Sequence, residues 1–543
     1  MTDVNTELTG GQALARGLKA YGVDTIFGLP GAQLDNFFDA LYEERESIRV
    51  IHTRHEQTTA YMAFGYAQAT GKVGVCLVVP GPGLLNAGAG LCTAYACNAP
   101  VLCIAGEIAS DQIDGGIGAL HEIPDQLGLL GHLTKRAARI ETPADTPALV
   151  EEAFRQLHSG RVRPVALEMA PDIMGQRGAV AMRPALAHWD AAPELDADAI
   201  DRAAKLLGAA RKPAILVGGG AKLVGAALQQ LAETLQAPVI MTPNGRGALS
   251  DRHPLALTQL GGHKLWSEID VVLAVGTRFD RPALDWGVGD LKVVRLDIDP
   301  EQIERLGAPE VGLVGEAAAG LAALAERVGR YNSVRESRAE EVAALREQAA
   351  DILFELQPLA DISAVIREEL SDDGVFVADI TQIGAFADIG FPVYEPRTFI
   401  GAGYQGTLGY GFATALGVKA GLPERKVISC NGDGGFMYTM PDLATAKQHG
   451  LNVVTVVFND GAYGNVRRIQ QTRYGGRHIA SDLENPDFVK LAESFDIPGR
   501  RVETPEKLRE AIREGLDLNA PMLIDYVTPL LPMVRHVSRG KVR

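Results

Sequence analysis

Asn431-Gly432-Asp433-Gly434-Gly435 ends an apolar stretch of the chain, and this segment decides the fold. Residues 425–430 before it predict a short buried strand. Residues 452–458 predict the next strand, which Asn459-Asp460-Gly461 follows, and residues 440–449 between the strands have a helical pattern. Because the carboxyl ends of parallel strands meet at one edge of a sheet, both polar turns are predicted to lie at a ligand-binding edge.

The residue types in these two turns suit a diphosphate group and a metal ion. Glycine lets the backbone approach a phosphate closely, and carboxylate or amide oxygens bind hard divalent cations. Taken alone, Gly432-Asp433-Gly434 is weak evidence, because Asp433 could also cap a helical turn that starts at Gly434-Gly435. The pair of turns together predicts a site for a diphosphate and magnesium.

Length and composition indicate a soluble enzyme. The chain has 543 residues, enough for about three domains. Its net charge is −16 and it contains no basic block, so we expect no nucleic-acid partner. No apolar stretch reaches the roughly 20 residues of a membrane span, and the N-terminus lacks the pattern of a signal peptide. We therefore expect a cytoplasmic protein that binds no membrane.

The five cysteines form no Cys-x-x-Cys pair, and most stand in apolar segments. They are interpreted as reduced core residues rather than as metal ligands or disulfide partners.

Strands alternate with helices along the whole chain, which favours parallel sheets covered on both faces. In the first part, strands are predicted at 25–29, 48–52, 73–79 and 100–105, helices at 10–21 and 56–70, and a closing strand near 165–168. Residues 174–197 have no clear periodicity and are predicted to be a linker. Residues 332–358 are charged and helix-like, and they are predicted to be a second linker.

A second α/β unit begins at Asp198, with strands predicted at 213–218, 237–241, 271–276 and 293–297. Gly218-Gly219-Gly220 follows the first of these strands. This triplet could hold a nucleotide phosphate. It is no Gly-x-Gly-x-x-Gly fingerprint, however, and a tight turn between strand and helix is favoured.

Further motifs occur in order over nearly the whole chain. They are Thr9-Gly-Gly-Gln, Phe27-Gly-Leu-Pro-Gly-Ala, Arg54-His-Glu-Gln, Gly65-Tyr-Ala-Gln-Ala-Thr-Gly-Lys, Pro80-Gly-Pro-Gly, Arg397-Thr-Phe-Ile, Gly406-Thr-Leu-Gly-Tyr-Gly and Asn485-Pro-Asp-Phe-Val-Lys-Leu-Ala. With Gly432-Asp433-Gly434, they make the chain resemble the thiamine diphosphate (ThDP) enzymes related to acetolactate synthase, benzoylformate decarboxylase and benzaldehyde lyase.

The resemblance implies the α/β fold of these enzymes, with three doubly wound parallel-sheet domains. We expect a pyrimidine-binding domain at 1–180, a central Rossmann-like domain at 195–330 and a diphosphate-binding domain at 355–543. It also implies ThDP and Mg²⁺ as cofactors. Cofactor-binding residues carried over from the family motifs are Glu56, Gly406, Leu408, Gly432, Asp433, Gly434, Gly435, Asn459, Asp460, Ala462 and Tyr463.

The metal ligands implied by the resemblance are Asp433, Asp460 and the main-chain carbonyl of Ala462. The family usually has an Asn-Asn pair where this chain has Asn459-Asp460. A second carboxylate is acceptable to a hard cation. Which of Asn459 and Asp460 turns toward the metal stays open.

Glu56 matches the family glutamate that hydrogen-bonds N1′ of the aminopyrimidine ring and so helps the cofactor lose the proton on its C2 carbon. In isolation it would be read as a glutamate favoured by the dipole at a helix start. Leu408 matches the apolar residue that wedges the two cofactor rings into a folded conformation. An ordinary core leucine is the alternative.

The substrate-side residues are less clear. Ala32-Gln33 stands where relatives carry a catalytic Asp, Ser or His, and Gln33 can still donate a hydrogen bond to a substrate carbonyl. His121 aligns near an active-site glutamine of the family, and it could protonate a bound intermediate or steer a carboxylate. The alternative is a surface or core histidine without such a role.

Several departures bear on the reaction. Asn465 and Ile469 replace the Met and Trp of many acetolactate synthases, and Tyr404-Gln405 replaces a usual Gly-Leu. Residues 260–270 are shorter than in the FAD-binding members, so FAD is not expected. We expect a carboligase or lyase acting on 2-oxo acids, hydroxy ketones or aldehydes, most like acetolactate synthase.

Three alternatives stay open: a non-oxidative 2-oxo-acid decarboxylase, a hydroxy-ketone or aldehyde lyase, and a catalytically silent protein that binds ThDP or a nucleotide. The family further implies a homodimer or homotetramer with its active sites at the subunit interface.

Overall fold

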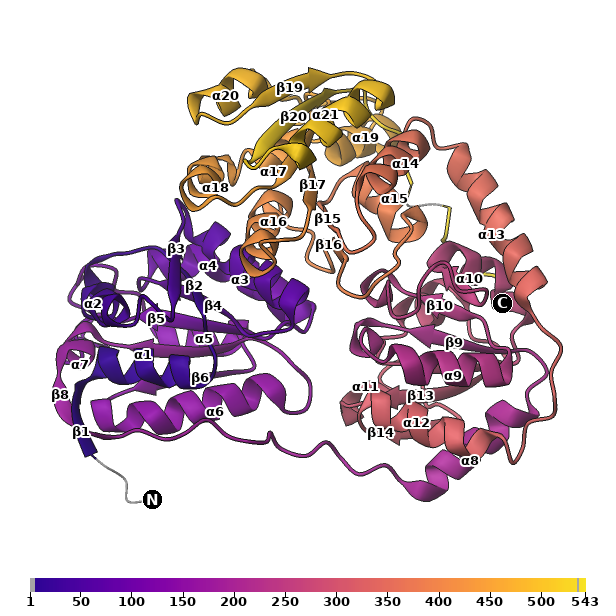
Figure 1. Cartoon of the computed structure of the whole chain (residues 1–543), viewed down its shortest axis with the longest axis horizontal. Helices are drawn as coiled ribbons and strands as arrows, with labels where there is room; N and C mark the ends of the chain where they lie inside the picture. The colour runs from indigo at the N-terminus through magenta and orange to yellow at the C-terminus, as the bar shows by residue number, and fades with distance from the viewer. Residues whose placement is uncertain (1–4, 535–536) are drawn as a thin grey trace. The chain divides into compact units, whose positions relative to one another are not determined.

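The computed structural model describes residues 5–534 and 537–543. It contains three six-stranded parallel sheets flanked by helices, and one antiparallel two-stranded ladder. The predicted α/β fold with three doubly wound parallel-sheet domains is therefore confirmed (Figure 1). The chain divides into two compact units, one formed by residues up to 190 with 402–502 and 514–527, the other by 191–401, 503–513 and 528 onward.

The first sheet has the strand order β3-β2-β4-β5-β7-β6. Its strands are β2 (Thr25–Gly28), β3 (Arg49–His52), β4 (Gly74–Val78), β5 (Val101–Gly106), β6 (Arg136–Ile140) and β7 (Val165–Met169). The helices around it are α1 (Gly10–Ala20), α2 (Asp35–Glu43), α3 (Glu56–Thr70), α4 (Pro82–Ala96), α5 (Gln126–Leu133), α6 (Thr146–His158) and α7 (Pro171–Gly175). All strands and helices predicted for this region are confirmed, whereas β6 was missed.

Both faces of the first sheet are covered, which explains its apolar strands. Val75 and Leu77 of β4 pack in one buried cluster with residues of α1 and α6. Phe27 on β2 points to the other face, where its ring lies 5.9 Å from that of Tyr66 on α3.

The linker predicted at 174–197 is wrong over its first part. β8 (Arg177–Ala181) pairs in an antiparallel ladder with β1 (Asn5–Thr9). Val180 is buried there against Leu8 and Ala13. Because this one buried side chain is the only strong apolar signal in β8, the period-2 pattern of a half-buried strand is not visible in the sequence.

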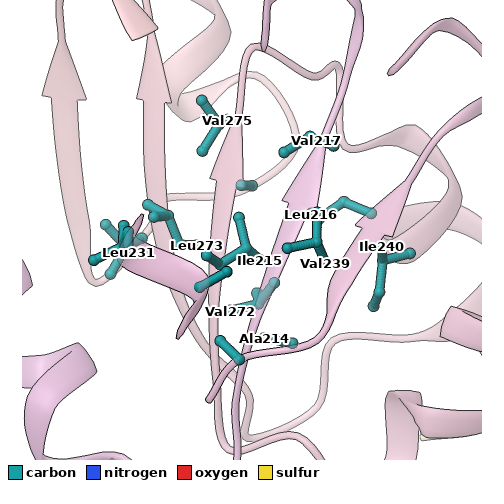
Figure 2. Packing of buried hydrophobic residues seen from close by; sticks show 14 of the residues in the cluster. Ala214, Ile215, Leu216, Val217, Leu231, Val239, Ile240, Val272, Leu273 and Val275 are labelled. Carbon is teal, nitrogen blue, oxygen red and sulfur yellow. The ribbon is translucent and has the colours of Figure 1, made fainter. Parts of the chain in front are cut away.

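The central sheet has the order β11-β10-β9-β12-β13-β14. Its strands are β9 (Pro213–Val217), β10 (Val239–Met241), β11 (Ala256–Thr258), β12 (Val271–Val275), β13 (Lys292–Asp297) and β14 (Val311–Val314), and its helices are α8 (Ala197–Ala209), α9 (Gly225–Leu235), α10 (Gln259–Leu265), α11 (Pro300–Glu304) and α12 (Ala317–Val328). Figure 2 shows Ile215, Ile240, Leu273 and Leu231 in its apolar core. The short edge strands β11 and β14 were missed.

Gly218-Gly219-Gly220 forms the turn after β9, as favoured from the sequence. A Cβ atom added to Gly218 would lie 2.4 Å from the carbonyl oxygen of Gly276, which follows β12. The glycines therefore serve the close approach of two backbone turns.

The segment predicted as a second linker is a packed helix, α13 (Ala339–Phe354). It buries Val342, Leu345 and Ala349, and Arg346 Nε donates to the carbonyl oxygen of Ala256 at 2.9 Å. Its helical character is confirmed, but it lies against the central domain instead of running free.

The third sheet has the order β16-β15-β17-β18-β20-β19. Its strands are β15 (Val375–Ala378), β16 (Phe399–Gly401), β17 (Val427–Gly432), β18 (Val454–Asn459), β19 (Gly499–Val502) and β20 (Met522–Val527). The helices of this region are α14 (Leu359–Glu369), α15 (Gln382–Gly390), α16 (Tyr410–Gly421), α17 (Asp433–Phe436), α18 (Leu443–His449), α19 (Gly464–Arg473), α20 (Phe488–Ser494) and α21 (Pro505–Asp517). β17 and β18 are parallel neighbours, as predicted. The exact domain limits stay a prediction.

Two features bear on the expected environment of the chain. None of the five cysteines forms a disulfide, and Cys76, Cys103 and Cys430 are buried. Among the described residues, no helix has both the length and the apolar character that crossing a membrane requires.

Helices α3 and α16 touch backbone to backbone. A Cβ atom added to Gly65 on α3 would lie 2.1 Å from the carbonyl oxygen of Thr414, and one added to Gly417 on α16 would lie 2.0 Å from that of Met62. Nearly every residue of both helices is buried. The two glycines therefore set the spacing of a helix pair inside the first unit.

Gly417→Ala is expected to destabilise the first unit by about 1–3 kcal/mol, because the added methyl group forces the helices apart. Gly131→Ala is the matched control. Gly131 lies in α5 with nothing within 4 Å of the added Cβ, so alanine should stabilise the helix by about 1 kcal/mol. Urea titration measures both, and equal effects of the two substitutions would contradict the close contact.

Candidate active site

Asp433 lies directly after β17, at the carboxyl edge of the third sheet. Its carboxylate is buried and accepts three hydrogen bonds: from Gly434 N at 2.7 Å, Gly461 N at 2.9 Å and Asn485 Nδ2 at 2.7 Å. Burial raises the pKa of Asp433, while these donors lower it. The polar turns after β17 and β18 therefore meet, as the sequence predicts.

Asp433 is not the cap of the following helical turn. α17 begins at Asp433 itself, and its N-cap is Gly432. Asp433 Oδ1 bonds only the adjacent Gly434 N–H, while Oδ2 bonds the turn after β18. The carboxylate thus joins two turns, which a simple cap would not do.

Asp460 and Asn459 point in different directions. Asn459 Nδ2 donates to Asp525 Oδ1 at 3.0 Å, and Asn459 Oδ1 accepts from Asn485 Nδ2 at 3.0 Å. Burial raises the pKa of Asp460 to about 6, and the negative charge of Asp433 is the second cause. Asp460 is therefore the residue whose charge lies beside that of Asp433.

Asn485 was not among the residues predicted for the site. Its amide bridges Asp433 and Asn459, and Asp525, which bonds Asn459, is held in turn by Arg501 Nε at 2.9 Å. The only sequence signal for Asn485 is its place in the family motif that it opens. Since it orients both turns, it belongs to the support of the site.

The other residues expected at the diphosphate surround Asp433. Gly434 and Gly435 are buried in α17, and the ring of Tyr463 packs against Gly434. Ala462 is buried, and its N–H donates to Asp460 Oδ1 at 3.2 Å. The structure thus brings together the predicted residues of 432–435 and 459–463.

Glu56 is the first residue of α3 and is buried. Asn86 Nδ2 on α4 donates to its Oε2 at 3.0 Å. His55 caps the helix by accepting Gln57 N–H on its Nδ1 at 3.1 Å. Glu56 does occupy a helix start, but an ordinary glutamate at such a place would stay in water.

Leu408 lies in the loop before α16 and is partly exposed, unlike an ordinary core leucine. Its carbonyl oxygen accepts Gln57 Nε2 at 2.8 Å, and the hydroxyl of Thr439 donates to the carbonyl of Gly409 at 3.4 Å. The neighbouring Gly406 has a φ of 66°. The loop 406–409 is thereby tied to the residue next to Glu56.

Gln33 and His121 lie in adjacent loops of the first sheet. Gln33 Nε2 donates to the carbonyl of Leu120 at 3.0 Å. A Cβ atom added to Gly81, close to Glu56 in the Pro80–Gly83 turn, would lie 2.3 Å from the carbonyl oxygen of His121. Gln33 Oε1 and His121 Nδ1 are buried without a hydrogen-bond partner in the described part of the chain.

His121 fits neither alternative reading completely. It is partly buried and has a φ of 70°, a left-handed conformation that few non-glycine residues adopt, although histidine adopts it more often than most. A backbone held in this way by the contact with Gly81 indicates a constrained loop rather than a free surface position.

Gln126 supports this loop cluster and was not found from the sequence. It is buried, its Oε1 accepts Gly81 N–H at 2.9 Å, and its Nε2 donates to Gly106 O at 2.9 Å and Glu168 Oε2 at 3.1 Å. A glutamine without apolar periodicity around it gives no sequence signal, because its role depends on tertiary contacts.

Helix α19, which follows Tyr463, has no buried residues. Asn465 and Ile469, which replace the Met and Trp of many acetolactate synthases, are both exposed on it. The side chains of Asn465 and Ile469 are therefore exposed to solvent on the helix that follows the turn with Asp460.

The donor set fits a divalent cation and a diphosphate. Asp433 and Asp460 place two carboxylates together, burial raises the pKa of both, and the negative charge of Asp433 raises that of Asp460 further. A hard cation with oxygen ligands compensates such a pair. Backbone N–H groups and glycines of residues 432–435 suit an anionic group beside that cation.

Comparison with known protein families agrees with this geometry. Residues 8–129 match the N-terminal TPP binding domain of thiamine pyrophosphate enzymes, residues 200–324 match their central domain, and residues 379–526 match their C-terminal TPP binding domain. All three sheets of the structure therefore have a counterpart in one enzyme family.

Similar proteins cover nearly the whole chain. It is 34% identical to a probable acetolactate synthase large subunit of Methanocaldococcus jannaschii, over 97% of this chain and 93% of that protein. It is 32% identical to acetolactate synthase isozyme 3 large subunit of Escherichia coli, over 99% and 97%. It is also 34% identical to a probable 2-ketoarginine decarboxylase of Pseudomonas aeruginosa, over 95% and 94%. The chain belongs to the thiamine diphosphate-dependent enzymes of the acetolactate synthase type.

Proposed function

We propose that this protein is a ThDP- and Mg²⁺-dependent carboligase or lyase acting on 2-oxo acids, with acetolactate-synthase-like carboligation as its main reaction. The observation that carries the proposal is that the carboxylates of Asp433 and Asp460 lie close together at the carboxyl edge of β17 and β18. The similarity to acetolactate synthase large subunits supports the carboligase assignment.

Asp433, Asp460 and the carbonyl of Ala462 would hold Mg²⁺, and Asn459 would orient Asp433 through Asn485. The backbone of residues 432–435 would hold the diphosphate beside the metal. When bound, ThDP supplies a nucleophilic carbon that adds to a substrate carbonyl and stores the electrons left after carbon–carbon cleavage.

The remaining predicted residues would contact the aminopyrimidine ring of the cofactor or the substrate. Glu56 would hold a proton between its carboxylate and N1′ of the aminopyrimidine ring. Leu408 would shape the cofactor pocket. Gln33 would donate a hydrogen bond to a substrate carbonyl. His121 would protonate the substrate carbon left after carbon–carbon cleavage, or it would orient a substrate carboxylate. The buried, unpartnered Gln33 Oε1 and His121 Nδ1 support roles in polar contacts that a ligand completes.

A 2-oxo-acid decarboxylase is the second candidate. It is favoured by the relative named as a probable 2-ketoarginine decarboxylase, which is as similar to this chain as the acetolactate synthase of M. jannaschii. A lyase for hydroxy ketones or aldehydes is a further candidate of the same chemistry. We propose no FAD, because residues 260–270 are shorter than in the FAD-binding members of the family.

The candidates differ in products. Holoenzyme is incubated with pyruvate and a panel of 2-oxo acids, and CO₂ and acyloin are followed together. CO₂ with acyloin supports the carboligase, CO₂ with free aldehyde supports the decarboxylase, and cleavage of an added acyloin alone supports the lyase. Sedimentation of the same sample tests the proposed homodimer or homotetramer, and an absorption spectrum without flavin bands is expected. Fractionation of the producing cells is expected to find the protein in the cytoplasm.

Glu56→Gln should keep ThDP binding and lower kcat by about 100-fold or more, because the amide has no carboxylate to hold the N1′ proton. Glu46→Gln is the control, since the Glu46 side chain is exposed. Calorimetry follows binding and CO₂ release follows turnover. Unchanged turnover of the Glu56 variant would refute its role.

Asp433→Ala and Asp460→Ala should each weaken Mg²⁺-dependent ThDP binding at least about 10-fold, because each removes a charged metal ligand. Glu484→Gln, an exposed acid of the same region, should bind normally. Calorimetry with and without a chelator measures the effect. Wild-type affinity in Asp460→Ala would instead point to Asn459 as the ligand.

A further inference from the structure

Glu56 is presented by a short turn, Thr53-Arg54-His55, between β3 and α3. The hydroxyl oxygens of Thr53 and Thr59 lie 2.5 Å apart, and His55 caps α3. These contacts fasten the turn to the helix that follows it. They do not fix where the turn stands relative to the rest of the first unit.

Thr53 N–H joins the turn to the carbonyl of Gly28 on β2 at 3.3 Å, and two side chains near α18 hold it from the other side. Arg54 N–H donates to Asp442 Oδ1 at 2.7 Å. The hydroxyl of Thr445 donates to the same Oδ1 at 2.7 Å and lies 3.2 Å from the carbonyl oxygen of His52. Asp442 and Thr445 together, called the Asp442 clamp here, thus reach both sides of the turn.

The Asp442 clamp buries a carboxylate, which costs free energy, and its hydrogen bonds go to specific partners. Asp442 and Thr445 are both fully buried, and burial raises the pKa of Asp442, whereas the hydrogen bonds that its Oδ1 accepts from Thr445 and the Arg54 N–H lower it. Asp442 Oδ2 has no hydrogen-bond partner among the described residues. A buried carboxylate costs free energy unless its hydrogen bonds repay it. Here the bond partners are the backbone of the turn and residues that face it.

A second contact beside the clamp holds the end of β3. His449 Nε2 lies 3.2 Å from His52 Nδ1, and Arg49 Nη2 donates to the carbonyl of His449 at 2.8 Å. Burial and the nearby charges of His52 and Arg49 lower the pKa of His449 to about 4. His449 is thus neutral at pH 7.

The clamp is also connected to the segment of the same chain that carries Asp433. Asp442 N–H donates to the carbonyl of Thr439 at 3.0 Å, and Thr439 bonds Gly409, next to Leu408. Thr439 follows α17, which starts at Asp433. One continuous segment, 433–445, therefore carries the acidic turn at one end and holds the Glu56 turn at the other.

We propose that Asp442 and Thr445 are positioning residues that hold the Glu56 carboxylate at its working place against the aminopyrimidine ring. The inference rests on the proposed function and adds residues to which no role had been given. It predicts that the clamp controls proton loss from the C2 carbon of bound ThDP more strongly than it controls ThDP binding.

The test uses the full-length Asp442→Ala, Thr445→Val and Asp442→Asn variants, with Gln448→Ala as the control because Gln448 is exposed on the same helix. Asparagine keeps an oxygen that accepts from Arg54 N–H, so it should rescue the function. Three quantities are measured: ThDP affinity by calorimetry, deuterium exchange at C2 of bound ThDP by NMR, and amide exchange of residues 53–58 in the apoprotein.

Asp442→Ala and Thr445→Val should slow C2 exchange by about 10–100-fold, the effect of a small misplacement of a catalytic group. ThDP affinity should change little, and amide exchange of the turn should be faster. Asp442→Asn and Gln448→Ala should stay close to wild type. Valine has nearly the same volume as threonine, so Thr445→Val is expected to fold. It therefore keeps the test valid if Asp442→Ala fails to fold.

The inference would be overturned by wild-type C2 exchange in Thr445→Val, or by a loss of ThDP affinity as large as the loss of exchange. Asp442→Asn as impaired as Asp442→Ala would also overturn positioning through these hydrogen bonds. The proposed function fails differently, because then the wild-type protein itself would neither bind ThDP nor exchange its C2 proton.

Discussion

The backbone contact between α3 and α16 is the constraint on which the candidate site depends. Gly65 and Gly417 allow the two helices to approach each other more closely than residues with a side chain would permit. α3 starts at Glu56, and α16 starts directly after Leu408-Gly409. Fixing the two helices against each other therefore fixes their first turns, and with them Glu56 and the loop 406–409. The bond from Gln57 to Leu408 shows that these ends meet.

Buried charge at the end of β17 and β18 is the second organising feature. The negative charge of Asp433 raises the pKa of Asp460, and burial raises the pKa of both carboxylates. Asn485 donates to Asp433, and Asn459, which bonds Asp525, accepts a second hydrogen bond from Asn485. Two buried carboxylates held in this way are typical of functional sites, and the proposed cation would offset their charge.

Much of the fold and part of the site could be predicted from the sequence. β17 and β18 could be predicted because both are apolar segments that end in polar turns. That these turns lie side by side followed because the carboxyl ends of parallel strands meet at one edge of the sheet. β8, β11 and β14 were not, since short edge strands bury too few side chains to show a period. Glu56 depended on the family resemblance, because a glutamate at a helix start has an ordinary explanation. Asn485, Gln126 and Asp442 act through contacts distant in sequence, which no local pattern encodes.

The anchoring of the His121 loop has a consequence for evolution. Gln33 holds this loop through the carbonyl of Leu120, and Gly81 packs on the carbonyl of His121 itself. Both anchors use main-chain atoms, so the side chain at 121 can be exchanged without loosening the loop. If His121 contacts the substrate as proposed, single substitutions at this position change which carbonyl compound is accepted, while the residues around Glu56 and Asp433 stay the same.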